Sequence, residues 1–142
     1  MKSDLAERFG QNPILRPHDL RPSTEGMEVT CLLNPGAFRY NGRTWLLFRV
    51  AERPIQHPGK ISFPILKPDG RTELLAFHAD DPRFDLSDPR VISFDGKDYL
   101  TTLSHLRLLS SDDGVRFTEP AGSQPWTGTG ELKAYGIEDC QW

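Results

Sequence analysis

Apolar and polar residues alternate along most of the chain beyond residue 30, with the period of two that is typical of β-strands. Turn-forming pairs such as Asn41-Gly42, Asp69-Gly70 and Asp95-Gly96 divide this pattern into short segments. The first four segments are joined by short connections and are predicted to form one antiparallel meander. In chain order, we expect strands over residues 36–40, 44–50, 60–66, 72–78, 90–94, 98–106, 107–111 and 115–118.

The first 29 residues have a different character, because they are polar and contain three X-Pro pairs, Asn12-Pro13, Arg16-Pro17 and Arg21-Pro22. A residue that precedes proline is biased away from the helical conformation. Residues 1–29 are therefore predicted to be an extended arm that wraps over a folded body at residues 30–142.

Two hairpin segments lie 54 residues apart, Asn41-Gly42-Arg43 and Asp95-Gly96-Lys97, and each is followed by an aromatic residue and Leu. Each is also preceded by a polar residue and proline, Asn34-Pro35 and Asp88-Pro89. A repeat of about 50 residues with four strands is typical of a β-propeller blade. The alternative is a pair of unrelated hairpins that share common turn chemistry.

The repeat predicts a shared position for three polar residues. The first strand of each propeller blade lines the central channel, so Asn34, Asp88 and Asp139 are expected to point into one axial pocket. Amide and carboxylate groups at a channel mouth suit sugar binding, because sugars are recognised by many hydrogen bonds.

Composition excludes several classes of function. The chain has 142 residues and a net charge of −3, which argues against nucleic acid as a partner. No apolar run approaches the roughly 20 residues of a membrane span, and the start has no apolar signal segment. Cys31 and Cys140 lie far apart and suggest neither a disulfide framework nor a metal site. We expect a cytoplasmic protein without a metal.

Several motifs, in the same order along the chain, resemble glycoside hydrolase family 130. The similarity covers residues 11–17 (QNPILRP), 33–38 (LNPGAF), 45–52 (WLLFRVAE), 87–91 (SDPRV), 99–106 (YLTTLSHL) and 135–139 (YGIED).

The resemblance implies a five-bladed β-propeller a little over twice as long as this chain. Blade one would lie at about residues 30–80, blade two at about 86–125, and the start of blade three at about 135–142. It implies inverting phosphorolysis of a β-mannoside oligosaccharide with release of mannose 1-phosphate. Inorganic phosphate would be a co-substrate, and no other cofactor is expected. Alternatives are a β-mannoside hydrolase of the same family or a non-catalytic carbohydrate-binding β-domain.

The resemblance also implies residue roles. Asp139 matches the catalytic acid, whereas Asn34 and Arg49 match residues that bind phosphate. Arg49 interrupts an apolar run, and a charge in such a place must be paired or line a cavity. Arg holds phosphate with two parallel hydrogen bonds. The alternative partner of Arg49 is Glu52 or another carboxylate.

Three further residues are candidates for contact with the sugar. Asp88 and Arg90 are expected to bind sugar hydroxyls or, alternatively, to form a structural ion pair. His105 and Arg107 share a face if their strand is continuous, and they line a pocket or have a structural role.

The sequence departs from the family after Asp139, where Cys140-Gln141-Trp142 replaces a segment that usually contains Arg. We therefore expect a truncated chain that is inactive alone. Open strand edges would favour association with further copies.

Overall fold

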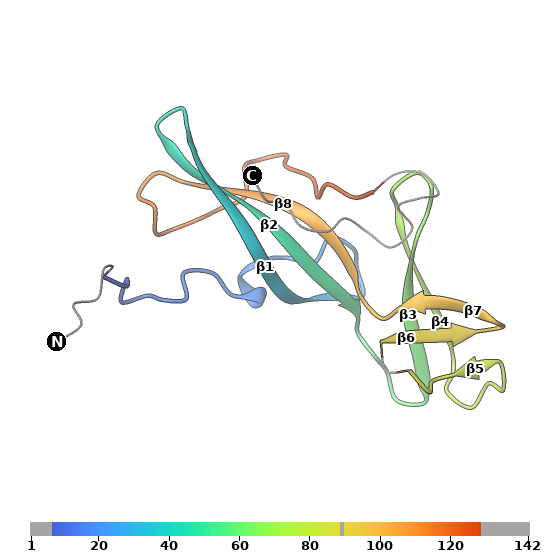
Figure 1. Cartoon of the computed structure of the whole chain (residues 1–142). Coiled ribbons are helices and arrows are strands. Elements are labelled where there is room, and N and C mark those ends of the chain that lie inside the picture. The colour runs from blue at the N-terminus through green and yellow to red at the C-terminus, as the bar shows by residue number, and fades with distance from the viewer. Residues whose placement is uncertain (1–6, 89, 129–142) are drawn as a thin grey trace.

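The computed structural model describes residues 7–88 and 90–128, and this part of the chain is almost entirely β-structure (Figure 1). A single turn of 3-10 helix, η1 (Pro17–Asp19), precedes the strands. The described strands are β1 (Met27–Tyr40), β2 (Arg43–Pro54), β3 (Lys60–Leu66), β4 (Thr72–His78), β5 (Phe84–Asp85), β6 (Val91–Phe94), β7 (Lys97–Leu100) and β8 (Leu103–Ser111). None of the described helical residues forms a helix long and apolar enough to cross a membrane.

The first sheet consists of three long antiparallel strands in the order β1-β2-β8, so β2 is central. Asn41 and Gly42 join β1 to β2 and have φ angles of 49° and 75°. Positive φ at both central residues is characteristic of a type I′ turn, whose twist matches that of the flanking strands. The predicted Asn-Gly hairpin is therefore confirmed.

Two smaller sheets, β3-β4 and β5-β6-β7, lie at the end of the molecule opposite the β1–β2 turn (Figure 1). Phe63 of β3 has no exposed surface and lies between them. Four rings surround it with centroids 4.5–6.4 Å away, which are Phe77, Phe84, Phe94 and Tyr99. Burial of these aromatic side chains stabilises the contact between the two small sheets.

The segment before β1 packs on one face of the first sheet. Leu20 is buried in a cluster with Leu46, Phe48, Val50 and Leu109. In Figure 1 this segment runs as an extended chain along the first sheet. The strand β1 begins at Met27, before the end of the predicted arm.

The predicted four-stranded meander is wrong, because β2 pairs with β8 rather than with β3. The predicted strand at 98–106 is also wrong, since β7 ends at Leu100 and β8 starts at Leu103. The break predicted after residue 106 does not exist, because β8 pairs with β2 through nine consecutive residue pairs. The predicted strand at 115–118 is reduced to one bridge, between Thr118 and Ser110.

The 54-residue repeat is visible in the backbone of the two turns. Asp95 and Gly96 have φ angles of 52° and 75°, close to those of Asn41 and Gly42. The strands around the second turn have 4 residues each, compared with 14 and 12 around the first. The two hairpins therefore share a turn but differ in the length of their strands.

Candidate functional site

The central strand β2 presents two chemically different faces. Successive side chains in a strand point to opposite sides, so Phe48, Val50 and Glu52 lie on one face. Phe48 and Val50 belong to the cluster that the N-terminal segment covers. Arg49 lies between them in sequence and therefore projects from the other face. We take this second face as the candidate functional site.

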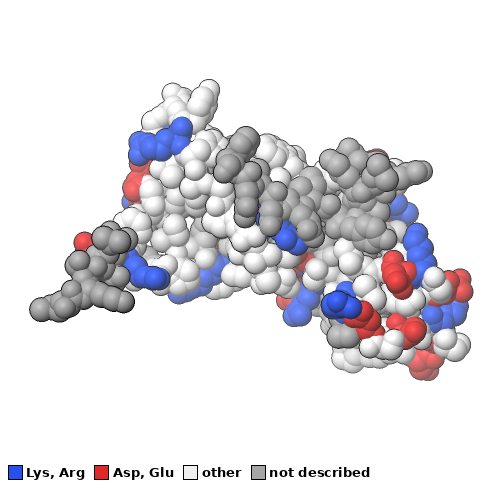
Figure 2. Space-filling view, viewed as in Figure 1, with Lys and Arg blue, Asp and Glu red and all other residues white. Residues whose placement is uncertain are grey.

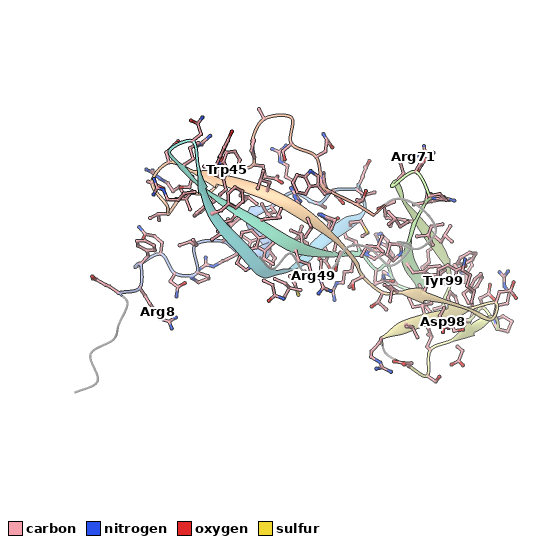
Figure 3. The ribbon with its side chains drawn as sticks, turned by 45° about the horizontal axis from the view of Figure 1, so that its top comes forward. Arg8, Trp45, Arg49, Arg71, Asp98 and Tyr99 are labelled. Carbon is pink, nitrogen blue, oxygen red and sulfur yellow. The ribbon has the colours of Figure 1, made fainter. Side chains whose placement is uncertain are left out.

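Arg49 is half-buried, and its Nε donates a hydrogen bond to Ser104 Oγ at 3.2 Å. Ser104 lies opposite Ala51 in β8, whereas Leu106 lies opposite Arg49. Ser104 is thus a diagonal neighbour of Arg49 on the same face of the sheet. Figure 3 shows Arg49 in the middle part of this sheet, away from Trp45 at the hairpin end.

Asn34 lies in β1 where the strand bulges. The register with β2 shifts between Leu33 and Gly36, and Leu33 is directly opposite Arg49. Asn34 is exposed and has a φ of 44°, a left-handed conformation that Asn tolerates better than most residues. The next residue, Pro35, has no N–H to lose from the ladder. Bulges redirect side chains and often lie beside active sites, and this one carries Asn34 next to the strand that contains Arg49.

The structure therefore brings two of the predicted phosphate residues, Asn34 and Arg49, to the same part of the first sheet. Glu52 is wrong as an alternative partner of Arg49, whereas a pair between Arg49 and another carboxylate stays a prediction. The side chains of Arg49 and Glu52 are an odd number of residues apart in a regularly paired strand and point to opposite faces.

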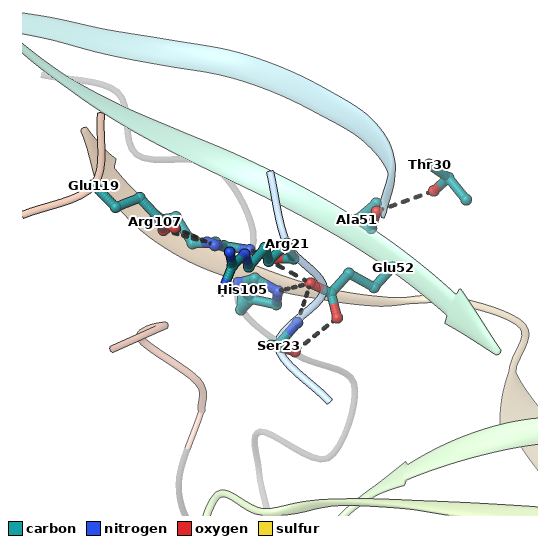
Figure 4. A network of polar contacts seen from close by, with 8 residues as sticks. All are labelled: Arg21, Ser23, Thr30, Ala51, Glu52, His105, Arg107 and Glu119. Atoms are coloured by element: carbon teal, nitrogen blue, oxygen red, sulfur yellow. Dashed lines mark hydrogen bonds and ion pairs between the residues drawn. The ribbon is translucent and has the colours of Figure 1, made fainter. Parts of the chain in front are cut away.

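Glu52 is the centre of a buried polar network on the face that the N-terminal segment covers (Figure 4). Its side chain is 1% exposed. The backbone N–H and hydroxyl of Ser23 donate to its two oxygens at 2.8 and 2.6 Å, and His105 Nε2 lies 3.0 Å from Oε1. Burial alone would raise the pKa of Glu52, but the adjacent His105 side chain and the hydrogen bonds from Ser23 outweigh it and hold this pKa below its ordinary value.

Arg107 extends the same network. Its guanidinium donates to both oxygens of Glu119 and to the backbone carbonyl of Arg21. A buried charge of this kind is tolerated because its donors are satisfied. The network thus fastens the N-terminal segment to β2 and β8.

His105 and Arg107 share one face, as predicted, because β8 is continuous through both. The cavity beside His105 has a volume of about 10 Å³, with Glu52 and Ser104 among its lining residues. That is room for about one water molecule and not for a sugar ring. The described surroundings of His105 are therefore those of a structural residue, and its contact with a sugar stays a prediction.

Asp88 and Arg90 form the structural ion pair that was the alternative to sugar binding. Arg90 Nη2 lies 2.7 Å from Asp88 Oδ2, and the Arg90 side chain is 85% exposed. Hydrogen bonds from Arg90 hold the pKa of Asp88 below its ordinary value. Figure 2 shows acidic and basic side chains intermingled over the end of the molecule that contains the two small sheets. Binding of sugar hydroxyls by Asp88 and Arg90 stays a prediction.

Asp139, the predicted catalytic acid, lies outside the described residues. Of the two remaining residues predicted to share its axial pocket, Asn34 belongs to the first sheet and Asp88 precedes β6 in a different sheet. The shared pocket stays a prediction.

Sequence reasoning missed Ser104 and the role of Glu52. Ser104 and Leu106 are two residues apart in β8 and therefore lie on the same face. The position of Ser104 opposite Ala51, however, follows only from the register between β2 and β8. Glu52 carries a weak signal, since an acidic residue at the end of an apolar strand requires a partner. Its partner Ser23 is 29 residues away and could not be identified by spacing.

No family model matches the sequence. The chain is 37% identical to beta-1,2-mannobiose phosphorylase of Listeria innocua serovar 6a, over 94% of this chain and 39% of that enzyme. The solved complex of beta-1,2-mannobiose phosphorylase from Listeria innocua with beta-1,2-mannobiose superposes with a TM-score of 0.73, covering 93% of this chain and 39% of that one.

The chain is therefore similar in sequence and in structure to a mannobiose phosphorylase. The resemblance predicted from the motifs is confirmed, and so is the all-β, propeller-type fold class, which is present only in part. The chain spans about 39% of the length of the Listeria enzyme that it matches.

Proposed function

We propose that this chain is part of a family 130 glycoside phosphorylase that cleaves a β-mannoside and releases mannose 1-phosphate. The observation that carries the proposal is the 37% identity to a mannobiose phosphorylase over 94% of the chain. The arrangement of Arg49 beside the Asn34 bulge supports it, because the two residues proposed for phosphate lie on one part of one sheet.

Phosphorolysis requires an acid but no catalytic base. A phosphate oxygen attacks the anomeric carbon while the glycosidic bond breaks, and the departing oxygen takes a proton. We assign proton donation to Asp139. Attack from the opposite side of the ring inverts the anomeric configuration.

Arg49 and Asn34 are proposed to bind the attacking phosphate. A guanidinium holds two phosphate oxygens in one plane and balances their charge. Asn34 projects from a bulge, where an amide N–H₂ can donate to a further oxygen. Asp88, Arg90 and His105 are proposed to contribute to sugar binding.

The 142-residue chain alone is proposed to bind its ligands without turning them over, since it spans 39% of the Listeria enzyme. A location in the cytoplasm and association into homo-oligomers remain part of the proposal.

Binding of inorganic phosphate to the chain, followed by ³¹P NMR line broadening, tests the phosphate assignment. We expect saturable binding that the substitution Arg49→Lys weakens about tenfold, because Lys keeps the charge but loses the planar fork. Arg53→Lys is the matched control, since Arg53 is exposed on the same strand and pairs with Glu28. Equal binding by both variants would contradict the assignment.

Incubation with beta-1,2-mannobiose separates the remaining alternatives. The phosphorylase proposal predicts mannobiose binding, and any turnover must require phosphate and yield mannose 1-phosphate. Free mannose released without phosphate would identify a hydrolase. Mannobiose binding with no effect of phosphate would favour a non-catalytic binding domain.

A further inference from the structure

We infer that Ser104 is a positioning residue, which orients the guanidinium of Arg49 for an anion. The inference rests on the proposed phosphate-binding role of Arg49. Ser104 itself makes no contact with the anion in this proposal and acts only through the Arg49 side chain.

The geometry of the contact carries the inference. Arg49 Nε donates to Ser104 Oγ at 3.2 Å across the β2–β8 ladder. The Nε and both Nη nitrogens lie in one plane, so a hydrogen bond at Nε restrains rotation of the whole group. The contact with Ser104 on the neighbouring strand thereby limits the directions in which the two Nη groups can point.

The surroundings make this restraint effective. Three residues on the same face, Leu47, Ala51 and Leu106, are at most 8% exposed. Because the Arg49–Ser104 contact is partly buried, this hydrogen bond to a charged group is stronger than it would be at an open surface. The base of the Arg49 side chain is therefore surrounded by apolar side chains, and Ser104 supplies a polar contact at its head.

The two neighbours of β2 also contribute in complementary ways. On one side, β1 bulges between Leu33 and Gly36 and carries Asn34. On the other side, the regular strand β8 carries Ser104.

An unrestrained Arg side chain loses rotational freedom when it binds an anion, whereas a side chain that is already oriented loses less.

Substitution by Thr and by Val provides a matched test, because these side chains have the same shape and differ in the hydroxyl group. Both favour strands, so both variants are expected to fold. We expect Ser104→Thr to bind inorganic phosphate within about twofold of the wild type. Ser104→Val is expected to bind about two- to tenfold more weakly, the cost of immobilising one long side chain.

A second measurement observes Arg49 directly. The ¹⁵N-bound Nε–H of Arg49, assigned by its loss in Arg49→Lys, is expected to exchange with water at least about tenfold faster in Ser104→Val than in Ser104→Thr. A purely structural role of Ser104 would change the unfolding midpoint without changing this exchange rate or the phosphate affinity.

The outcomes separate the inference from the proposed function. If phosphate fails to bind the wild type, or binds without any change at Arg49, both the phosphate assignment and the inference are overturned. If phosphate binds through Arg49 and Ser104→Val binds as well as Ser104→Thr, only the role of Ser104 is overturned. The inference is supported if Ser104→Val, but not Ser104→Thr, shows both weaker phosphate binding and faster exchange of the Arg49 Nε–H.

Discussion

Removal of the Glu52 carboxylate is predicted to loosen the N-terminal segment and to destabilise the whole sheet. Glu52 joins three parts of the chain, because Ser23 lies in the N-terminal segment and His105 in β8. Glu52→Gln keeps the size of the side chain and removes the charge. Glu52→Ala removes the carboxylate altogether, so that His105 Nε2 at 3.0 Å and Arg107 Nη1 at 3.7 Å lose a nearby negative charge.

The magnitude follows from the contacts. The carboxylate accepts two hydrogen bonds from Ser23, at 2.8 and 2.6 Å, and lies 3.0 Å from His105. Hydrogen bonds to a charged group contribute about 1.5–3 kcal/mol each, and removal of one partner from a buried network costs about 3–5 kcal/mol. We expect Glu52→Ala to lower the free energy of unfolding by about 3–5 kcal/mol and Glu52→Gln by about 2 kcal/mol. Since domains are stable by about 5–15 kcal/mol, either loss is measurable.

The pH dependence has a defined sign. The folded-state pKa of Glu52 is lowered from an ordinary value of 4.5. A carboxyl whose pKa is depressed by folding contributes stability that is fully present above its unfolded pKa. That contribution is lost as the pH falls below 4.5 and through the folded pKa. The stability difference between wild type and Glu52→Gln is therefore expected to shrink as the solution is acidified below this value.

Urea unfolding followed by tryptophan fluorescence measures the effect at pH 7 and at successively lower pH. Glu28→Gln is the control, because Glu28 in β1 forms an exposed ion pair with Arg53, the residue that follows Glu52 in β2. Exposed pairs contribute about 0–1 kcal/mol, so this variant is expected to unfold close to the wild type. If Glu52→Gln lost no more stability than Glu28→Gln, the buried network would not fasten the N-terminal segment.

Three other predictions concern separate parts of the chain. Phe63→Ala is expected to lower the free energy of unfolding by about 3–5 kcal/mol, whereas the exposed Phe9→Ala should have little effect in the same urea titration. Gly42→Ala is expected to cost about 1 kcal/mol by thermal unfolding, since φ is 75° and the surrounding space is open, so only backbone strain is added. Hydrogen bonds from Arg83 lower the pKa of Asp81 to about 2, so ¹³C NMR should show Asp81 titrating near this value and moving upward in Arg83→Ala.

Local chemistry was enough to predict the short-range features of the fold. The limits of β3 and β4 agree with the predicted ranges 60–66 and 72–78, because the turn residues Pro58-Gly59 and Asp69-Gly70 bound these segments in the sequence. The turn at Asp95-Gly96 has the expected left-handed conformation, since these residue types tolerate it best. Such features depend on residues a few positions apart.

Long-range pairing was not predictable in the same way. The partner of β2 is β8, and the residues that face each other, such as Val50 and His105, are 55 positions apart in sequence. A hairpin interpretation favoured β3 because it follows directly in the chain. The two-residue strand β5 is too short to show any period.

In the candidate site, too, short-range features were predictable and long-range contacts were not. Arg49 was predicted correctly as a charge that needs a partner. The contact with Ser104 could not be predicted, because it depends on the register between β2 and β8. Glu52 is excluded as a partner because it lies on the opposite face of β2. Asp88 and Arg90 are two residues apart, so their ion pair was a stated alternative. Motif similarity reached further than physical periodicity, since it indicated a family of β-mannoside enzymes without any knowledge of strand order, and the 37% identity to a mannobiose phosphorylase agrees with it.

The two faces of β2 depend on one register. A slip of one residue against β8 would exchange the faces and turn Arg49 toward Leu20 and Leu109, which do not belong to β2. Burial of a bare guanidinium there would be very costly, so Arg49 itself opposes the slip. Glu52 opposes it from the other side, because only the observed register places His105 within 3.0 Å of the carboxylate. The buried network and the candidate phosphate site therefore stabilise each other, although they lie on opposite faces.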